Sequence, residues 1–350
     1  MDELFDKALG AYLGFAIGDA LGATVEFMLP REIAHRYGVH RDIVGGGWLK
    51  LASGQVTDDT TMSLALGGAL LAGGVDALQR HAQGDDALVR HIGDAYVQWF
   101  KSRPVDCGNT CRRGIMRYML DGSLQGPENP GDGGNGALMR NLPAVLATLS
   151  NDAAFERVSM AQARLTHHHP LSDAATVGLG RLLRLILAGA DRSAVALWTE
   201  HWVLDNPSFR FTPYRGYATA YVLDTVQTVL HYLTLHADFE TALVATVNQG
   251  DDADTTGALV GMLAGARCGA SRLPPRWLSR LKPEVLQAIT DQTSGLLALA
   301  RSPKGRCYGC LPARGQGNWS TEMKQPFIKK GKATSGGGSS DGYGIKVPKA

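Results

Sequence analysis

The chain has 350 residues, of which 44% are hydrophobic, so it is long enough to bury a sizeable core. Its net charge of +2 is unevenly distributed: residues 301–350 carry ten basic and two acidic side chains, and residues 1–300 carry 25 basic and 31 acidic ones. Because the main body is mildly acidic, we do not expect it to bind nucleic acid.

The first residues, MDELFDKALG, are acidic and lack the apolar segment of a signal peptide. The longest apolar stretch, residues 60–75, is short and rich in glycine, so no membrane-spanning helix is expected. Five cysteines form a sparse, odd-numbered set, which is typical of a reducing compartment without a disulfide framework. These features predict a cytoplasmic protein.

Apolar residues recur at intervals of three and four along most of the first 300 residues, and this spacing predicts helices. In the first helix, residues 7–22, four glycines fall on one face and predict close contact with another helix: Gly10, Gly14, Gly18 and Gly22. The other clear helical segments are 87–100, 174–190, 217–235, 239–248 and 255–269. Clean alternation of the kind that marks strands is scarce, so we predict a compact, single-domain all-α fold over residues 1–301.

The polar residues that could carry chemistry are concentrated in the loops between these helices, at residues 45–56, 103–110, 127–136 and 165–173. Residues 302–350 differ from the rest because they are basic, rich in glycine and without apolar periodicity. We expect this tail to be disordered. Cys307 and Cys310 form a lone C-x-x-C pair in it, with no second pair to complete a zinc site.

Two segments share one plan: a polar turn, carboxylates, threonines and then an apolar helix. They are QVTDDTTMSLALGGALLAG (55–73) and NQGDDADTTGALVGMLAGA (248–266). Aspartate and threonine are ordinary N-cap residues, so either segment alone fits a simple helix start. Two such helix starts would bring buried carboxylates together, which is costly unless a cation compensates. Oxygen ligands favour Mg²⁺, Mn²⁺ or Ca²⁺ over Zn²⁺.

A calcium-binding EF-hand loop is excluded by its last position. Counting from Asp252, the twelfth residue should be a glutamate and is Leu263. Five or more oxygen ligands suit two cations about 3.5–4 Å apart, which can activate water for hydrolysis. The residues alone therefore predict a two-metal hydrolase of unknown substrate.

Six motifs, in this order, resemble the ADP-ribosylglycohydrolase family: GDALGATVEF, VTDDTTMSLAL, PVDCGNTCRRG, GNGALMRNLP, THHHPLSDA and NQGDDADTTGALVGMLAGA. The resemblance implies an all-α fold around two Mn²⁺ (or Mg²⁺) ions. It also implies hydrolysis of the N-glycosidic bond between ADP-ribose and an arginine side chain. GGGWLKL, FTPYRGYATAYVLDTVQTV and PPRWL further resemble members that reactivate the ADP-ribosylated nitrogenase iron protein. Those members imply a monomer, a PII-type signalling partner and sequestration at the membrane.

The resemblance also implies the site residues, by their position in the motifs. It places the metal ligands at Thr57, Asp58, Asp59, Asp252, Asp254 and Thr255. The catalytic candidates are Asp106, Glu26 and Asp59, and Asn109 joins Asp106 in a substrate-side loop. A loop N-cap is the alternative role for Asp106.

The glycine-rich residues 131–140 suit a diphosphate, because backbone N–H groups can approach an anion where side chains are absent. The resemblance adds Asn135, Gly136 and Met139 as ligand-lining residues. Arg140, the next residue, could instead form an internal salt bridge.

Of three consecutive histidines, only His167 falls on the family's position near the nucleotide. We expect His168 and His169 at the surface. Tyr214 and Tyr221 are candidates to stack on or hydrogen-bond the ligand, with core packing as the alternative.

Three other functions remain open. The first is hydrolysis of another ADP-ribosyl linkage, to O-acetyl-ADP-ribose, serine or a nucleic-acid base. The others are a two-metal phosphoesterase and a non-catalytic ADP-ribose-binding protein. For the proposed hydrolysis, hydroxide attack on the anomeric carbon and ring opening followed by hydrolysis are both compatible with the sequence.

Overall fold

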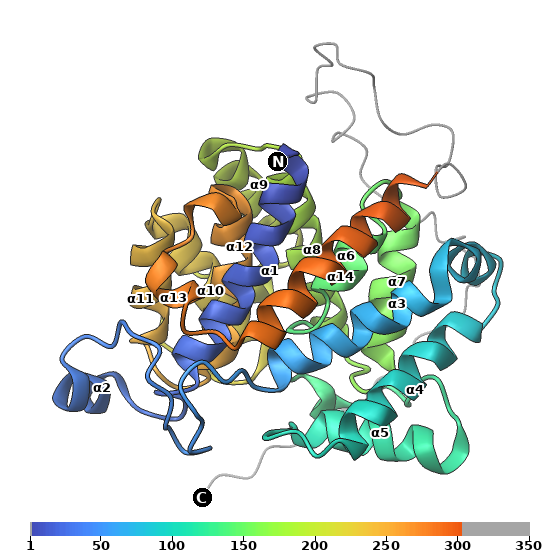
Figure 1. Cartoon of the computed structure of the whole chain (residues 1–350), viewed down its shortest axis with the longest axis horizontal. Coiled ribbons are helices and arrows are strands. Elements are labelled where there is room, and N and C mark those ends of the chain that lie inside the picture. The colour runs from blue at the N-terminus through green and yellow to red at the C-terminus, as the bar shows by residue number, and fades with distance from the viewer. Residues whose placement is uncertain (1, 303–350) are drawn as a thin grey trace, which may run out of the picture. The chain divides into compact units, whose positions relative to one another are not determined.

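The computed structural model describes residues 2–302, which form helices joined by loops (Figure 1). The α-helices are α1 (Glu3–Gly22), α2 (Pro30–Tyr37), α3 (Asp58–Ala82), α4 (Ala87–Lys101), α5 (Asn109–Asp121), α6 (Leu142–Ala147), α7 (Asp152–Arg164), α8 (Pro170–Leu187), α9 (Arg192–Asp205), α10 (Val222–Leu235), α11 (Phe239–Val247), α12 (Ala253–Cys268), α13 (Pro275–Leu278) and α14 (Pro283–Arg301). Short 3₁₀ turns are η1 (Pro130–Asp132), η2 (Pro207–Phe209) and η3 (Ala270–Arg272). Within residues 2–302, β-type pairing is limited to two isolated bridges. The prediction of an all-α fold is confirmed.

The centre of the bundle is the pair of helices α1 and α12, which lie side by side in Figure 1. The predicted glycine face of α1 meets a second small-residue face on α12. A Cβ atom added to Gly14 would lie 2.3 Å from the Gly261 carbonyl oxygen, and one added to Gly18 would lie 2.1 Å from that of Gly257. Only helices without side chains at the contact can approach so closely. The prediction of close helix packing is confirmed.

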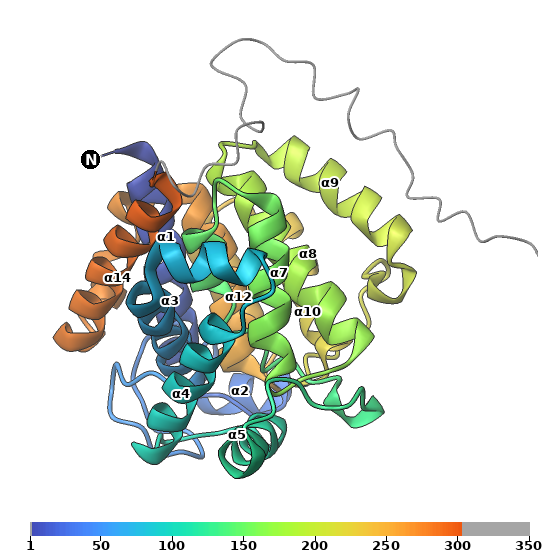
Figure 2. The same ribbon diagram turned by 90° about the vertical axis from the view of Figure 1, so that its right-hand side faces the viewer.

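This pair runs antiparallel, because successive glycines of α1 meet successively earlier residues of α12. The end of α1 therefore meets the start of α12, where a Cβ atom on Gly22 would lie 2.1 Å from the Ala253 carbonyl oxygen. Glu26 and Asp252, which follow and precede these helix ends, are thereby brought into one region. Figure 2 shows α14 and α9 on opposite sides of this central pair.

The start of α3 is fixed to α1 through Asp19. The buried Asp19 carboxylate accepts hydrogen bonds from the backbone N–H groups of Thr57 and Thr60, at 3.0 and 3.1 Å, and from the Thr60 hydroxyl at 2.5 Å. N–H groups at a helix start have no partner within their own helix, so the Asp19 carboxylate, from another helix, satisfies donors at the start of α3 that the N-cap does not. The two Asp–Thr segments thus start helices anchored to α1.

One predicted helix begins later than expected. The apolar spacing predicts a helix over residues 217–235, but α10 begins at Val222. The carbonyl of Ala218 accepts from the Asp252 N–H, and that of Ala220 accepts from the Asn135 N–H. A helical segment would direct these carbonyls to its own next turn, so the tertiary pairing keeps residues 217–221 out of the helix.

Two expectations about the whole chain have different outcomes. We expected no membrane-spanning segment, yet α3 meets the length and composition of one, as core helices of soluble proteins also do. Its backbone leaves helical geometry at Gly74. The predicted tail, with Cys307 and Cys310, lies outside the described residues from position 303 onward, so its disorder and the boundary at 301 stay predictions.

Candidate active site

The predicted metal ligands come together at the starts of α3 and α12. All six are buried, with at most 6% of any residue exposed: Thr57, Asp58, Asp59, Asp252, Asp254 and Thr255. The Thr255 hydroxyl donates to Asp59 Oδ1 at 3.2 Å and so joins the two segments directly. Side chains almost two hundred positions apart in the sequence therefore share one buried, oxygen-rich centre, which we call the acidic centre.

The alternative role of these residues, helix capping, describes Thr57 and in part Asp254, whose Oδ1 accepts from the Thr255 N–H in the first turn of α12 at 2.9 Å. Thr57 is the N-cap of α3 and accepts from the Asp59 N–H at 3.4 Å. Asp252 occupies the N-cap position of α12, but its side chain makes no capping hydrogen bond. Asp19 accepts from the Thr60 N–H and Thr57 from the Asp59 N–H, so the side chains of Asp58 and Asp59 do not cap these two groups of α3. Their carboxylates are available to the acidic centre.

Glu26 belongs to the acidic centre as well. One carboxylate oxygen from each of Glu26, Asp252 and Asp254 lies within 4.8 Å of the other two. Glu26 Oε2 also accepts from the indole N–H of Trp48 at 2.6 Å. The structure thus places Glu26 beside two of the predicted metal ligands.

Asp106 lies on the loop that covers the Asp58 side of the acidic centre. The neighbouring Gly108 N–H donates to Asp58 Oδ2 at 3.4 Å, and Asp106 Oδ1 accepts from the Cys107 N–H at 2.7 Å. Asn109 is exposed as the first residue of α5. The structure therefore places the substrate-side loop next to Asp58, with Asn109 on its outer side.

The crowding of buried acids raises their pKa values. Burial is the largest cause for Glu26, followed by the charges of Asp252, Asp106 and Asp58, and its pKa rises to about 8 despite the Trp48 hydrogen bond. Burial and the Asp106 charge raise the pKa of Asp58 to about 7. The pKa values of Asp59 and Asp254 are raised well above the usual range, again chiefly by burial. Uncompensated carboxylates thus favour their protonated forms here.

These residues fit a pair of hard divalent cations. Asp59 Oδ2 is buried and has no hydrogen-bond partner among the described residues, a costly state for an isolated carboxylate oxygen. The donors are carboxylates and hydroxyls, the oxygen ligands that Mg²⁺ and Mn²⁺ prefer. Leu263, the residue that excluded an EF-hand, is buried within α12.

The glycine-rich loop lies against α5 and His167. A Cβ atom on Gly136 would lie 2.8 Å from both Cys111 Sγ and His167 Cε1, so no side chain fits there. Asn135 turns toward the acidic centre: its side-chain amide donates to Asp252 Oδ2 at 2.5 Å and to the Thr225 hydroxyl at 2.9 Å. Met139 is buried beneath the loop. Asn135 thus orients a predicted metal ligand from the predicted diphosphate loop.

Arg140 is fully buried, and its hydrogen-bond partners among the described residues are neutral, so the alternative role of an internal salt bridge does not describe it. Its guanidinium donates to the Gly136 carbonyl at 3.0 Å and to the Thr166 hydroxyl at 2.7 Å, and it lies 4.6 Å from the centre of the Tyr96 ring. Backbone carbonyls, a hydroxyl and the face of an aromatic ring therefore compensate the buried positive charge of the guanidinium, without a carboxylate. The arginine therefore ties the glycine-rich loop to the segment that carries His167.

The same hydrogen bonds favour one tautomer of His167. A guanidinium only donates, so the Thr166 hydroxyl accepts from Arg140 and keeps its own hydrogen for another acceptor. His167 Nδ1 lies 2.8 Å from that hydroxyl oxygen, whereas the Ala163 carbonyl lies 3.5 Å away. Donation to Nδ1 leaves the ring hydrogen on Nε2.

Nε2 faces the glycine-rich loop, 3.1 Å from where a Cβ atom of Gly136 would be. Burial, followed by the charges of Arg140 and Arg113, lowers the pKa of His167 well below its usual value. His167 thus presents a neutral N–H donor to the loop.

His168 and His169 differ from the expectation, because both are half-buried rather than at the surface. His168 Nδ1 lies 2.7 Å from the Gly126 carbonyl oxygen, and His169 Nδ1 accepts from the Leu171 N–H at the start of α8. Both histidines hold loop structure.

The two predicted tyrosines are in different situations. The Tyr214 hydroxyl bonds Thr228 at 2.9 Å, and its ring stacks on His231 at a centroid distance of 4.3 Å, so the packing alternative describes it. Tyr221 is 43% exposed, and its ring lies 2.8 Å from where a Cβ atom of Gly133 would be. Tyr221 borders the glycine-rich loop, whereas the side chain of Tyr214 packs against α10.

Sequence reasoning missed three contributors to the site: Asp19, Trp48 and Thr166. Each occurs inside or beside a segment singled out from the sequence, namely GDALG, GGGWLKL and LTHHHP. A lone acid in a buried helix, next to its glycine face, was the available signal for Asp19. Trp48 and Thr166 carried no such signal, because their partners are fixed only by the tertiary fold.

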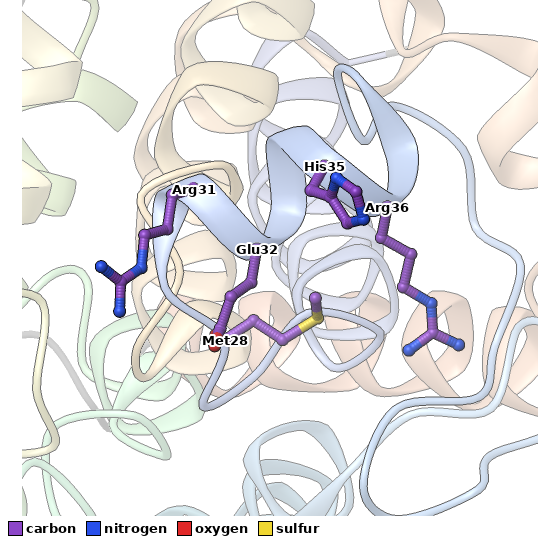
Figure 3. A pocket seen from close by; sticks show the side chains of 5 residues that line it. All are labelled: Met28, Arg31, Glu32, His35 and Arg36. Atoms are coloured by element: carbon purple, nitrogen blue, oxygen red, sulfur yellow. The ribbon is translucent and has the colours of Figure 1, made fainter.

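A separate hollow of about 590 Å³ lies on α2, lined by Met28, Arg31, Glu32, His35 and Arg36. Figure 3 shows Arg31 and Arg36 extending away from the helix on either side of Glu32 and Met28. None of its lining residues is a predicted site residue.

Comparison with known proteins agrees with this geometry. The family model of ADP-ribosylglycohydrolase matches residues 1–306. The chain is 52% identical over 298 residues to ADP-ribosyl-[dinitrogen reductase] glycohydrolase of Rhodospirillum rubrum, covering 85% of this chain and 98% of that protein. It is 31% identical over 295 residues to ADP-ribosylarginine hydrolase Tri1 of Pseudomonas putida (strain GB-1), covering 80% of this chain and 75% of the relative.

A solved structure described as an ADP-ribosylglycohydrolase-related protein complex is similar with a TM-score of 0.72 and 31% identity. The similarity covers 86% of this chain and 100% of that one. The motifs, the helical architecture and the matched length lead to one conclusion: this chain belongs to the ADP-ribosylglycohydrolase family.

Proposed function

We propose that this chain removes ADP-ribose from an ADP-ribosylated arginine of a protein, by hydrolysis of the N-glycosidic bond, and that the protein is the nitrogenase iron protein. The relative from Rhodospirillum rubrum is named for dinitrogen reductase, and the Tri1 relatives are named for ADP-ribosylarginine. These names favour arginine over O-acetyl-ADP-ribose, serine or a nucleic-acid base. The observation that carries the proposal is the buried acidic centre at the starts of α3 and α12.

Two divalent cations, Mn²⁺ or Mg²⁺, belong to the proposal. Thr57, Asp58, Asp59, Asp252, Asp254 and Thr255 would hold them, because their carboxylates and hydroxyls are buried together. Cations bound there would supply Lewis-acid activation of water and electrostatic stabilisation of the transition state.

The side chains around the acidic centre have separate roles. Glu26, whose carboxylate lies beside those of Asp252 and Asp254, is a candidate to move a proton to or from the attacking water and the leaving guanidine. Asp106 is the second candidate for this transfer, from the Asp58 side. In direct attack the proton goes to the departing guanidine as the C–N bond breaks, whereas in ring opening it goes first to the ribose ring oxygen and the C–N bond breaks afterwards. Asn135 orients Asp252, and His167 offers a neutral N–H donor beside the glycine-rich loop.

The remaining features rest on family likeness and charge. They are a cytoplasmic monomer without nucleic-acid binding, a PII-type signalling partner and sequestration at the membrane.

Variants of the acidic centre test the proposal. Asp59→Ala and Asp252→Ala should abolish metal-dependent release of ADP-ribose from ADP-ribosylated nitrogenase iron protein. Asp251→Asn is the matched control, because Asp251 neighbours Asp252 and its positive φ of 57° suits asparagine. Near-normal turnover in both alanine variants would sink the metal assignment. Equal turnover of an unrelated arginine-modified protein would remove the preference for the iron protein.

A further inference from the structure

Two exposed aromatic side chains lie together at the edge of the acidic centre. Phe27 is 60% exposed and Trp48 is 51% exposed. Their ring centroids lie 5.3 Å apart with the planes tilted by 50°. Large aromatic rings tend to be buried, so two in contact on the surface indicate a surface that receives something.

The backbone holds Phe27 in a costly conformation. Its φ of +61° lies in the left-handed region, which is unfavourable for a bulky residue. The Phe27 N–H donates to the Asp251 carbonyl at 2.6 Å, and the Asp251 N–H donates to the Met28 carbonyl at 2.9 Å. This double hydrogen bond ties the strained residue directly to the segment that enters α12 and carries Asp252.

Trp48 is presented by an equally constrained turn. It follows three glycines with positive φ, Gly45, Gly46 and Gly47. Gly46 and Leu51 close the turn with two backbone hydrogen bonds of 2.8 and 2.9 Å. The indole ring is therefore held in place despite its exposure.

A carboxylate completes this arrangement. The indole N–H of Trp48 donates to Glu26 Oε2 at 2.6 Å, and Glu26 reaches to within 4.8 Å of Asp252 and Asp254. Ring faces beside a carboxylate recognise a flat, weakly hydrated cation: the rings stack on its plane and the acid accepts its N–H groups. A guanidinium has this chemistry, whereas a diphosphate would be repelled by the neighbouring acids.

We propose that Phe27, Trp48 and Glu26 form the subsite for the arginine side chain that leaves ADP-ribose. This inference rests on the proposed function and adds the residues that select the leaving group. The rings contact the guanidinium and its stem, and the glycine-rich loop with His167 serves the opposite, nucleotide end. The subsite therefore distinguishes arginine from leaving groups without a planar cation.

Agmatine and ADP-ribose separate the two ends of the substrate, because agmatine has the guanidinium alone and ADP-ribose lacks it. Each is titrated by calorimetry into the full chain with Mn²⁺, for wild type, Phe27→Ala and Trp48→Ala. Both alanine variants should weaken agmatine binding by roughly three- to thirtyfold, the range of one cation–π contact. Their affinity for ADP-ribose should stay within about twofold of wild type, because neither ring contacts the nucleotide in this proposal.

Two further variants separate ring loss from other effects. Trp48→Phe keeps a ring but loses the N–H to Glu26, so it should bind agmatine more tightly than Trp48→Ala. Trp198→Ala removes a tryptophan from another aromatic pair, stacked on Trp202 at 5.9 Å, and should leave both affinities unchanged.

Unchanged agmatine binding in Phe27→Ala and Trp48→Ala would overturn the proposal. A loss of ADP-ribose affinity instead would show that the rings stack on adenine, and would overturn it as well. The titrations measure binding and need no turnover. If the wild type binds agmatine through these rings but hydrolyses nothing, the subsite proposal stands and the proposed function is contradicted.

Discussion

Glu26 and Asp58 hold protons at pH values where surface carboxylates are ionised. Burial is the first cause for both, and neighbouring acids add to it, which gives pKa values of about 8 and about 7. Unfolding returns both groups to the ordinary carboxyl range near 4. A cation that binds between the carboxylates must displace these protons, so metal binding and protonation compete.

The first prediction follows from that competition. Between pH 4 and 8 Glu26 and Asp58 bind more protons in the folded metal-free protein than in the unfolded chain, so their contribution to stability falls as pH rises through this range. Mn²⁺ should bind more weakly at pH 6 than at pH 8. For each proton that the cation displaces, its affinity should fall by roughly tenfold for each pH unit. The rise in Tm on adding Mn²⁺, measured against a chelated sample, should therefore be larger at pH 8 than at pH 6. An equal or larger rise at pH 6 contradicts the assignment.

The second prediction concerns His167. Thr166→Val removes the hydroxyl that Arg140 orients, so Nδ1 loses its donor and the tautomer is no longer fixed. Turnover should fall roughly tenfold, the effect of one buried hydrogen bond, and Thr166→Ser should retain it. Nitrogen-15 NMR should show hydrogen on Nε2 of His167 in wild type and a mixture in the valine variant. Hydrogen on Nδ1 in wild type would refute the assignment.

Individual site residues were predictable where the sequence itself groups them. Two segments with adjacent aspartates and threonines before apolar helices indicate a shared oxygen-rich site. The partners of Asp19 and Trp48 were not predictable, because they lie 38 and 22 positions away and are selected by the packing of helices and turns. The neutral surroundings of Arg140 were missed for the same reason.

Among the elements, α1 and α12 decide where the site forms. Their glycine faces allow backbone contact, and this contact sets the end of α1 against the start of α12. Spacing of four predicted that α1 packs closely, because glycines at that interval share a face. The spacing did not identify the partner, since several other segments are rich in small residues.

The third prediction tests this contact. Gly18→Ala places a Cβ atom 2.1 Å from the Gly257 carbonyl oxygen, so the backbones must separate. We expect a loss of about 3 kcal/mol in the free energy of unfolding. Gly68→Ala on α3 meets nothing within 4 Å and should instead stabilise by about 0.5–1 kcal/mol, through helix propensity. Denaturant unfolding of both variants gives the comparison, and equal stabilities would contradict close packing.

At the scale of the whole molecule, the uneven charge separates an acidic body from a basic tail. The family match ends at residue 306, and the relative from Rhodospirillum rubrum is covered over 98% of its length by this chain. The sequence predicted the all-α class, because helical periodicity persists for 300 residues. The arrangement of those helices depends on contacts between distant segments, which periodicity does not encode.

The fourth prediction concerns the tail. A chain that ends after Ser302 should hydrolyse ADP-ribosyl-arginine with kcat/KM within about twofold of the full chain, because every site residue precedes α13. Steady-state kinetics on purified protein measures the ratio. A large loss of kcat/KM in the shorter chain would assign the tail a part in catalysis.

The most direct test of the central claim is the release of free ADP-ribose from arginine-ADP-ribosylated nitrogenase iron protein. The assay is run with Mn²⁺, after chelation, and after Mn²⁺ is restored. The account predicts release with Mn²⁺, loss of release on chelation and recovery on restoration. Release that persists after complete chelation, or no release by folded protein with Mn²⁺ or Mg²⁺, would contradict it.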